Sequence, residues 1–213
     1  MKTLVDALFK WSIKPWVMAM VVLIVTGCFL YVDKPLAYLL HGYSEPVLPL
    51  VLGVFTHLGD NKIYLVGLFL LTLIFQYFFR KEQYARNTLF LWACVLFPSI
   101  ICFVLKVCFG RARSCLLFDD QAYGFYGFQM NQAYWSFPSG HTTTIMGMAL
   151  GLCVLFPRYR LAFLLAGLLV ILSRVVLLEH YLSDVFMASY LAVLEIGFLV
   201  FIFRRRGLLV GEA

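Results

Sequence analysis

The stretch Leu89–Val107, LFLWACVLFPSIICFVLKV, decides the fold class of this chain. It holds nineteen residues, and Lys106 near its end is the only charged one. A helix needs roughly 17–25 apolar residues to cross the hydrocarbon of a bilayer, so this stretch predicts a transmembrane helix. Backbone groups in lipid must be satisfied within the segment, which favours a helix over an isolated strand.

Further apolar runs follow the same pattern, and they are Trp16–Val32, Ile63–Phe79, Thr142–Phe156, Leu161–Leu178 and Val185–Phe203. The fourth of the six runs in chain order is short, and it spans only if its helix begins near Ser139. The composition agrees, with 63% hydrophobic and 13% charged residues, against about half and about a quarter in soluble domains. The expected fold is all-α, a polytopic bundle of six transmembrane helices forming a single domain over residues 1–213.

Basic residues gather in alternate connections of this expected bundle. They precede the first span, follow the second, separate the fourth from the fifth and follow the sixth, as Lys10, Arg80, Arg158 and Arg205 show. Cytoplasmic loops carry an excess of Lys and Arg, so we expect both termini in the cytoplasm. The net charge of +6 then reflects membrane topology and predicts no nucleic-acid partner.

The N-terminal region raises two questions. Leu4, Leu8 and Trp11 share one helical face, which favours a short helix at the membrane interface. No small-residue cleavage site follows the first apolar run, which argues against a cleaved secretory signal. The segment Val25–Cys28, VTGC, loosely resembles a lipoprotein acylation box, but the apolar run continues past Cys28 and favours an uncleaved span over acylation.

Polar residues stand at the outer ends of four expected spans, where an apolar bundle does not need them. Charges at membrane depth are costly and usually mark function. These residues are Lys106, Arg111 and Arg113 at the end of the third span and just beyond it, Ser139, Gly140 and His141 before the fourth, Ser173 and Arg174 ending the fifth, and His180 and Asp184 beginning the sixth. We expect them to converge on an active site at the outer membrane face.

Two of these groups have a recognisable chemistry. A helix beginning after Ser139 directs free backbone N–H groups outward, Gly140 lets an anion approach them, and His141 adds a titratable proton. His180 and Asp184 are four residues apart and meet if they share one helix. The carboxylate would then fix the imidazole tautomer and leave the other nitrogen as nucleophile or base. Taken alone, this pair is equally compatible with a local helix cap.

The remaining charged residues are assigned by their helical positions. Lys106 and Arg113 are two turns apart and share a face if the helix continues to Arg113. Arg111 lies off that stripe, and we expect it to extend to the lipid headgroups. Glu179 projects about 100° from the neighbouring histidine, which predicts a solvent-facing rim residue. Glu195, three turns into the sixth span, is expected to bond within the bundle.

The candidate site residues together indicate one class of chemistry. They comprise several cations, a helix N-terminus, two histidines and one carboxylate. Cations and backbone N–H groups suit a tetrahedral oxyanion such as phosphate. No cluster of carboxylates is available for Mg²⁺ or Zn²⁺, and the six cysteines show no C-x-x-C or metal-ligand spacing. The prediction is phosphoryl transfer without a metal or other cofactor.

These residues resemble the type 2 phosphatidic acid phosphatase family, whose motifs are K-x6-R-P, P-S-G-H and S-R-x5-H-x3-D. The corresponding segments are Lys106–Arg113, Pro138–His141 and Ser173–Asp184. The second and third motifs match fully, whereas Ser114 stands where the first has proline. The resemblance also implies six membrane helices.

The family pattern implies a role for each motif residue. His180 would attack phosphorus and form a phosphohistidine, Asp184 would orient it, and His141 would protonate the leaving oxygen and then activate water. The resemblance assigns the phosphoryl oxygens to Lys106, Arg113, Ser139, the Gly140 N–H and Arg174.

The implied partner is a lipid phosphate in the bilayer of a bacterial inner membrane, with the site facing the periplasm. Candidate substrates are a polyprenyl diphosphate, phosphatidylglycerophosphate, phosphatidic acid and a lipid A phosphate. A lipid phosphotransferase using the same intermediate is an alternative that the sequence does not separate from a phosphatase. A non-catalytic anion or lipid transporter is a second alternative, but it would need more intramembrane polar residues than Glu195 and scattered Ser and Thr.

Two connections flank the expected site. The segment Gly110–Phe137 is rich in aromatic residues, which would either cap the site or anchor the protein in the membrane interface. The segment Asp33–Asp60 is expected to form a partly immersed outer loop, with His41 and His57 as ordinary interface residues.

Overall fold

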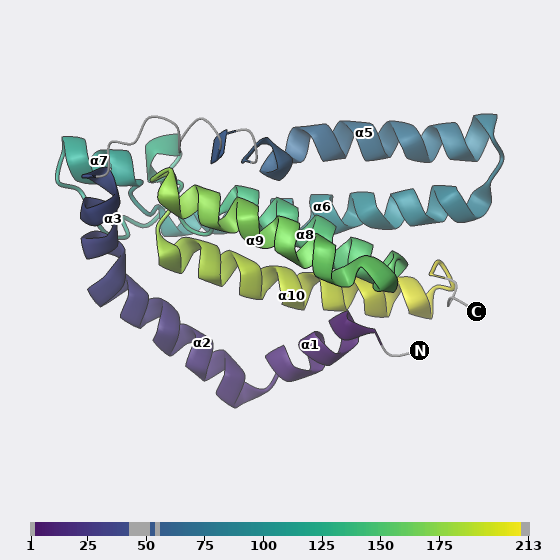
Figure 1. Cartoon of the computed structure of the whole chain (residues 1–213), viewed down its shortest axis with the longest axis horizontal. Coiled ribbons are helices and arrows are strands. Elements are labelled where there is room, and N and C mark those ends of the chain that lie inside the picture. Colours follow the sequence, from purple (N-terminus) through teal and green to yellow (C-terminus); the bar gives the residue numbers. More distant parts are fainter. Residues whose placement is uncertain (1–2, 43–51, 54–55, 210–213) are drawn as a thin grey trace.

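The computed structural model describes residues 3–42, 52–53 and 56–209, and its regular elements are helical (Figure 1). Within these ranges the only β-type pairing is an isolated antiparallel bridge between Arg111 and Phe125. The α-helices are α1 (Leu4–Ser12), α2 (Pro15–Gly27), α3 (Asp33–His41), α5 (Asn61–Leu73), α6 (Glu82–Phe109), α7 (Ser114–Asp119), α8 (Gly140–Leu155), α9 (Arg160–Val176) and α10 (Leu182–Arg205). Shorter π and 3-10 turns are η1 (Cys28–Val32), η2 (His57–Gly59), η3 (Ile74–Phe78), η4 (Gln132–Tyr134) and η5 (Pro157–Tyr159).

The all-α membrane architecture is confirmed in its main feature. Five helical segments of the described chain are long and apolar enough to cross a bilayer. They are Pro15–His41, Asn61–Phe78, Glu82–Phe109, Pro157–Val176 and Leu182–Arg205. The remaining predicted span is the helix α8, which is apolar but only 16 residues long. The count of six complete spans therefore stays a prediction.

The first span is longer than the sequence indicated. Helix α2 passes through the π-helical turn η1 into α3, so helix continues across Cys28 and on to His41. The prediction of an outer loop beginning at Asp33 was therefore wrong for its first nine residues. The rest of that loop includes residues 43–51 and 54–55, which lie outside the described part of the chain.

Helix α8 lies inside the bundle, against α6, α9 and α10 (Figure 1). Most of its side chains are buried, and its Gly147 approaches the Cys94 carbonyl so closely that a Cβ would lie 2.3 Å from that oxygen. Small residues allow this kind of close helix packing in membranes. Neighbouring helices therefore shield most of α8 from lipid and hold its first turn in place.

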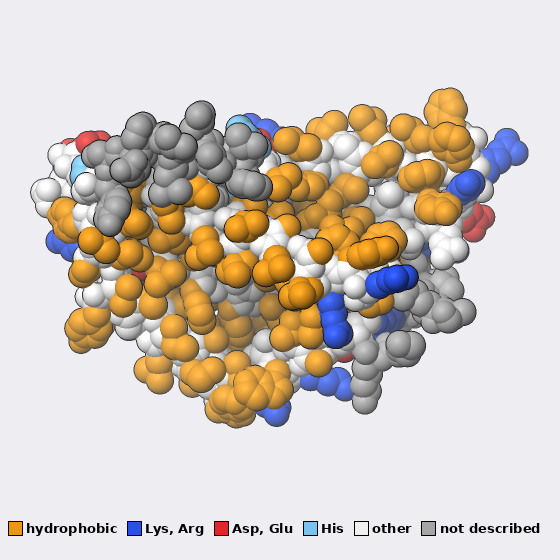
Figure 2. Space-filling model, viewed as in Figure 1, with side chains coloured by type: hydrophobic (Ala, Val, Ile, Leu, Met, Phe, Trp, Pro, Cys, Tyr) orange, Lys and Arg blue, Asp and Glu red, His pale blue; other side chains and the backbone are white. Residues whose placement is uncertain are grey.

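The bundle has two chemically distinct ends. The α5–α6 turn and the C-terminal end of α10 lie at one end, whereas α3 and α7 lie at the other (Figure 1). Hydrophobic side chains cover the middle of the visible face, and many of its Lys and Arg side chains gather toward the α5–α6 end (Figure 2). This is the asymmetry predicted from the alternate basic connections. Which end faces the cytoplasm stays a prediction.

The N-terminal helix α1 forms as predicted and is tied to the end of α10. Thr3 caps it, with its backbone N–H donating to Asp6 Oδ2 at 2.6 Å, and Arg204 Nη1 donates to the same carboxylate at 2.8 Å. Val5 is fully buried, while Trp11 is exposed. The location of α1 at the membrane interface stays a prediction.

Candidate active site

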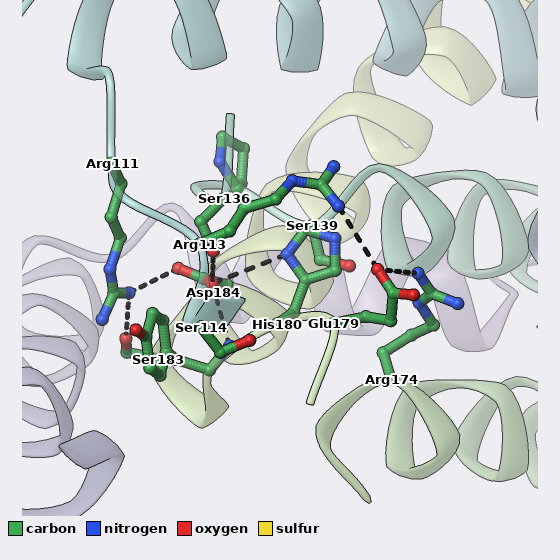
Figure 3. Close-up of polar contacts among 12 residues, drawn as sticks. Arg111, Arg113, Ser114, Ser136, Ser139, Arg174, Glu179, His180, Ser183 and Asp184 are labelled. Atoms are coloured by element: carbon green, nitrogen blue, oxygen red, sulfur yellow. Dashed lines mark hydrogen bonds and ion pairs between the residues drawn. The ribbon is translucent and has the colours of Figure 1, made fainter. Parts of the chain in front are cut away.

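The predicted site residues converge at the α3–α7 end of the bundle, where the ends of α6 and α9 meet the beginnings of α8 and α10 (Figure 3). Helix α8 begins as predicted: Ser139 is its N-cap, and the Ser139 Oγ accepts from the Thr142 N–H at 3.4 Å. The Ser139 N–H donates to the Asp184 carbonyl at 3.3 Å, which joins the starts of α8 and α10. Four sequence-distant segments therefore form one site.

A cavity of about 200 Å³ opens beside this helix start. It brings Lys106 and His141 together, as predicted, and adds residues from the start of α5 that the sequence did not indicate. The lining residues are Gly59, Asp60, Asn61, Ser99, Cys102, Phe103, Lys106, Gly140, His141 and Thr144.

Lys106 and Arg113 reach the site by different routes, so the expected shared helix face does not exist. Helix α6 ends at Phe109, because Gly110 adopts a left-handed conformation with φ 54° that favours glycine. Lys106 stays on the helix and donates from Nζ to the Trp135 carbonyl at 2.6 Å. Arg113 lies on the chain beyond the helix and pairs with Glu179 at 3.3 Å. Both cations nevertheless lie at the site.

The His180–Asp184 contact forms, but not along one helix. His180 precedes α10 in a turn, and its Nδ1 lies 3.5 Å from Asp184 Oδ2, a charge contact that is too long or poorly aligned to count as a hydrogen bond. The same carboxylate oxygen accepts the Tyr181 N–H at 3.0 Å and the Ser136 hydroxyl at 2.6 Å. Asp184 therefore caps the helix and contacts the histidine at once, so the two interpretations of this pair coexist.

Burial controls the protonation of His180. Its side chain is 2% exposed, and this burial lowers the pKa of His180 to about 3, although Asp184 acts in the opposite direction. The imidazole is therefore neutral near pH 7. With Nδ1 directed at the carboxylate, the second ring nitrogen keeps a free lone pair.

Arg111 belongs to a buried ion-pair network behind this histidine, and the prediction that it extends to the lipid headgroups was wrong. Its side chain is fully buried. Its Nη2 lies 2.8 Å from Asp33 Oδ2, and its Nη1 donates to both Asp184 and the Ser183 hydroxyl. Asp33 also accepts the Ser183 N–H at 3.1 Å. We call Arg111, Asp33, Ser183 and Asp184 the buried ion-pair network.

Aromatic rings enclose the Arg111 guanidinium. Its central carbon lies 4.5 Å from the Tyr181 ring centroid and 5.0 Å from that of Phe29, distances typical of cation–π contacts. Burial alone would lower the pKa of Arg111, but the carboxylates of Asp184 and Asp33 raise it overall, so the charge is retained. Tyr123, from the connection after α6, donates from its hydroxyl to the Phe29 carbonyl at 2.5 Å.

The aromatic connection 110–137 therefore caps the α3–α7 end of the bundle with part of its rings. Tyr123 stacks on Phe29 at 5.0 Å, and Phe125 packs against Phe137 at 5.4 Å. Phe128, in contrast, is 71% exposed and is free to meet the membrane interface. These ring contacts support the capping alternative for Tyr123 and Phe125, and anchoring in the membrane interface stays a prediction.

Glu179 is placed at the site rather than at a passive rim, which corrects the sequence-based assignment. Its Oε2 lies 3.3 Å from Arg113 Nη1 and 3.3 Å from Arg174 Nη2 (Figure 3). Its side chain is 45% exposed, so the expected contact with solvent is present as well. We call Arg113, Arg174 and Glu179 the arginine–glutamate cluster.

Ser114 explains how the chain tolerates the missing proline of the first motif. It is the first residue of α7, a position that favours proline because the backbone N–H is not needed there. The Ser114 side chain is buried, and its hydroxyl donates to the Leu178 carbonyl. This bond attaches the segment after Arg113 to the turn that carries Glu179 and His180.

Other sequence-based expectations have mixed outcomes. Glu195 is buried in α10, but its Oε2 has no hydrogen-bond partner in the described part of the chain, so the expected bond is not formed at that atom. His41 stacks on Phe118 at 4.0 Å and joins α3 to α7. Cys108 and Cys115 are exposed and not bonded to each other. Among the described residues, no three His, Cys, Asp or Glu side chains are grouped as a metal site.

Comparison with known families agrees with the family that the motifs indicate. The model of the PAP2 superfamily matches residues 87–208, more than half of the chain, so the chain belongs to this superfamily. A solved structure adds the fold: the crystal structure of a transmembrane PAP2-type phosphatidylglycerolphosphate phosphatase from Bacillus subtilis superposes with a TM-score of 0.59. The superposition covers 89% of this chain and 94% of that one, at 20% identity.

Two curated relatives are more similar in sequence over a shorter region. Both are lipid A 1-phosphatases, from Rhizobium etli and Rhizobium johnstonii, and each is 38% identical over 96 residues. The match covers 45% of this chain, and 41% and 39% of the two relatives. This chain therefore matches about two fifths of the length of these relatives.

Proposed function

We propose that this protein is a membrane lipid phosphatase that works without a metal and uses His180 as its nucleophile. The position of His180 is the observation that carries the proposal. Its ring is neutral, one nitrogen faces Asp184, and the residue beside it contacts Arg113 and Arg174. Membership of the PAP2 superfamily and the phosphatase relatives support the same chemistry.

The proposed reaction has two steps at one phosphorus atom. Burial and the neighbouring cations lower the pKa of His141 to about 4 in the free site, so in this proposal the ring takes up a proton from the bound phosphate monoanion. The free nitrogen of His180 attacks, the bond between phosphorus and the lipid oxygen breaks, and His141 gives that oxygen this proton. Water then attacks the phosphohistidine, His141 takes a proton from the water, and the N–P bond breaks to release phosphate. Proton transfer by a positioned side chain typically contributes about 10²- to 10⁴-fold to such steps.

Charge complementarity supports the remaining roles. Lys106, Arg113 and Arg174 would bind the phosphoryl oxygens, because cations stabilise the charge spread over them in the transition state. The first turn of α8 would add the Ser139 hydroxyl and the Gly140 N–H, since a helix N-terminus favours anions. Asp184 would hold the neutral tautomer of His180 and stabilise the cationic ring that forms during attack.

The substrate class follows from the relatives and from the position of the site. The site lies at one end of a bundle with an apolar surface, where the headgroup of a bilayer lipid is within reach. The relatives that are 38% identical are lipid A 1-phosphatases, so a lipid A 1-phosphate is the first substrate to test. Phosphatidylglycerophosphate, phosphatidic acid and polyprenyl diphosphates are the next.

The proposal is tested with purified protein in detergent containing excess EDTA. We expect phosphate release from at least one of these lipids, and inhibition by vanadate. A rapid quench in alkaline denaturant with labelled substrate should trap a phosphoprotein that is labile in acid and stable in base. His180→Ala should abolish turnover and adduct together, whereas an adduct that persists in His180→Ala would assign the nucleophile elsewhere. Restoration of a chelated enzyme by Mg²⁺ would contradict metal independence.

The same assay separates hydrolysis from transfer. A phosphatase gives inorganic phosphate in proportion to substrate consumed. A phosphotransferase gives a second labelled lipid and little free phosphate when an acceptor lipid is added.

We further propose that both termini lie in the cytoplasm of a bacterial cell and that the site faces the periplasm of the inner membrane. The test uses a variant without native cysteines and with single cysteines at Gln121 or Gln83, both exposed and at opposite ends of the bundle. A membrane-impermeant thiol reagent added to cells with a permeabilised outer membrane should label position 121 and spare position 83. The reverse pattern would contradict this orientation.

A further inference from the structure

The arginine–glutamate cluster shows an anion already bound where the phosphoryl group would bind. A single carboxylate oxygen, Oε2 of Glu179, lies 3.3 Å from a guanidinium nitrogen of Arg113 and 3.3 Å from one of Arg174 (Figure 3). The two arginines come from the connection after α6 and from the end of α9, yet they meet at that oxygen. A carboxylate oxygen between two guanidinium groups has the charge and the surroundings of a phosphoryl oxygen.

We infer that Glu179 is a resident counter-anion that competes with phosphate for Arg113 and Arg174 and thereby sets the affinity of the site for phosphate. The inference rests on the proposed function, because it assigns both arginines to phosphate binding. It concerns how tightly substrate and product are bound. Glu179 itself has no role in the two chemical steps.

The exposure of the three side chains favours displacement of the glutamate rather than the arginines. The Glu179 side chain is 45% exposed, whereas that of Arg174 is 6% exposed and that of Arg113 is 30% exposed. A glutamate that turns outward exchanges its arginine contacts for water. The arginines stay in place to meet the incoming anion, so Glu179 needs to move only its own side chain.

Charge accounting gives the consequence. Lys106, Arg113 and Arg174 supply three positive charges, and Glu179 neutralises part of them until phosphate displaces it. Without the glutamate, phosphate displaces only water from the arginines, so it binds more tightly and dissociates more slowly. Glu179 would therefore prevent the site from retaining inorganic phosphate after the second step.

The opposite role is also physically reasonable and gives the opposite result. If Glu179 served to hold the two arginines in position, its removal would loosen them and weaken phosphate binding. The sign of the change in phosphate affinity therefore decides between competition and positioning.

The experiment is calorimetric titration of inorganic phosphate, and of vanadate, into the purified protein in detergent. Displacing a carboxylate from a partly solvated cation about 4 Å away costs about a factor of ten in affinity, so Glu179→Gln should bind phosphate about tenfold more tightly than the wild type. Glu179→Ala should change affinity in the same direction, which keeps the test valid if one variant folds poorly.

Glu82→Gln is the matched control, because it makes the same change in net charge at an exposed residue on the far end of α6. Within the described part of the chain, the ion pair of Glu82 is with Arg86, at 3.7 Å. Its phosphate affinity should equal that of the wild type. Unchanged or weaker binding in both Glu179 variants would overturn the inference, as would the absence of phosphate binding in every protein. Failure of the wild type to hydrolyse any lipid phosphate would instead contradict the proposed function and leave the binding comparison intact.

Discussion

Arg111 and Arg113 are two residues apart in the segment GRAR, and they have opposite environments. Arg111 is fully buried behind His180 and pairs with two carboxylates whose side chains are also fully buried. Arg113 lies in front of the site, 30% exposed, and pairs with a carboxylate that is 45% exposed. One arginine forms part of the support of the active site, and the other forms part of the surface that would receive phosphate.

The difference shows how one site combines a fixed geometry with exchangeable charges. A buried ion pair cannot be broken cheaply, because the remaining charge has neither partner nor water. The buried ion-pair network therefore holds Asp184, and through it His180, in one position. A partly exposed ion pair contributes little to stability and is replaced by water or another anion at small cost. The ion pairs of the arginine–glutamate cluster are partly exposed in this way, so another anion can replace Glu179 at small cost.

The largest effect should come from removing the buried arginine. Arg111→Met leaves Asp33 and Asp184 buried without their cation, which costs roughly 3–5 kcal/mol of stability. Arg113→Met should cost about 1 kcal/mol or less, because its single carboxylate partner is partly solvated. The measurement is the midpoint of unfolding of both variants in one detergent. We expect a far larger decrease for Arg111→Met.

A second substitution sharpens this test. Adding Asp33→Asn to Arg111→Met removes one of the two unpaired carboxylates and should recover part of the lost stability. Equal decreases for the two arginine variants, or no recovery in the double variant, would show that the buried ion-pair network is not what separates the two regions.

Much of the site was predictable because its signals are local. Pro138, Ser139 and Gly140 specify a helix start in a few residues, and the structure places that start at the site as expected. The apolar runs likewise predict helices through their length alone. Asp184, four residues after His180, was expected to contact it, and the contact forms even though a turn rather than a helix brings the two together.

The buried ion-pair network was not predictable, because its partners are far apart in the sequence. Arg111 looked like an ordinary cation at a helix end, and only the left-handed turn at Gly110 directs the chain inward. Asp33 looked like the first residue of a loop, and it meets Ser183 from 150 positions away. The one available signal was that Asp33 follows an apolar run directly, where a carboxylate needs a cationic partner.

The smaller effect concerns His141, whose position depends on a glycine in another element. Gly59, in η2, packs so closely that a Cβ there would lie 2.8 Å from the His141 Cβ, closer than such atoms approach. Gly59→Ala should therefore displace His141 while leaving the buried ion-pair network intact. Because misplacing a catalytic group by about 1 Å can cost roughly 100-fold, we expect a 10- to 100-fold loss of turnover on lipid phosphates. A nitrophenyl phosphate, whose leaving oxygen needs little protonation, should lose much less.

Gly67→Ala, with no atom within 4 Å of the added Cβ, is the matched control and should match the wild type on both substrates. An equal loss on both substrates in Gly59→Ala would mean that the displaced group acts in phosphate binding or in the attack by His180, and not as the proton donor.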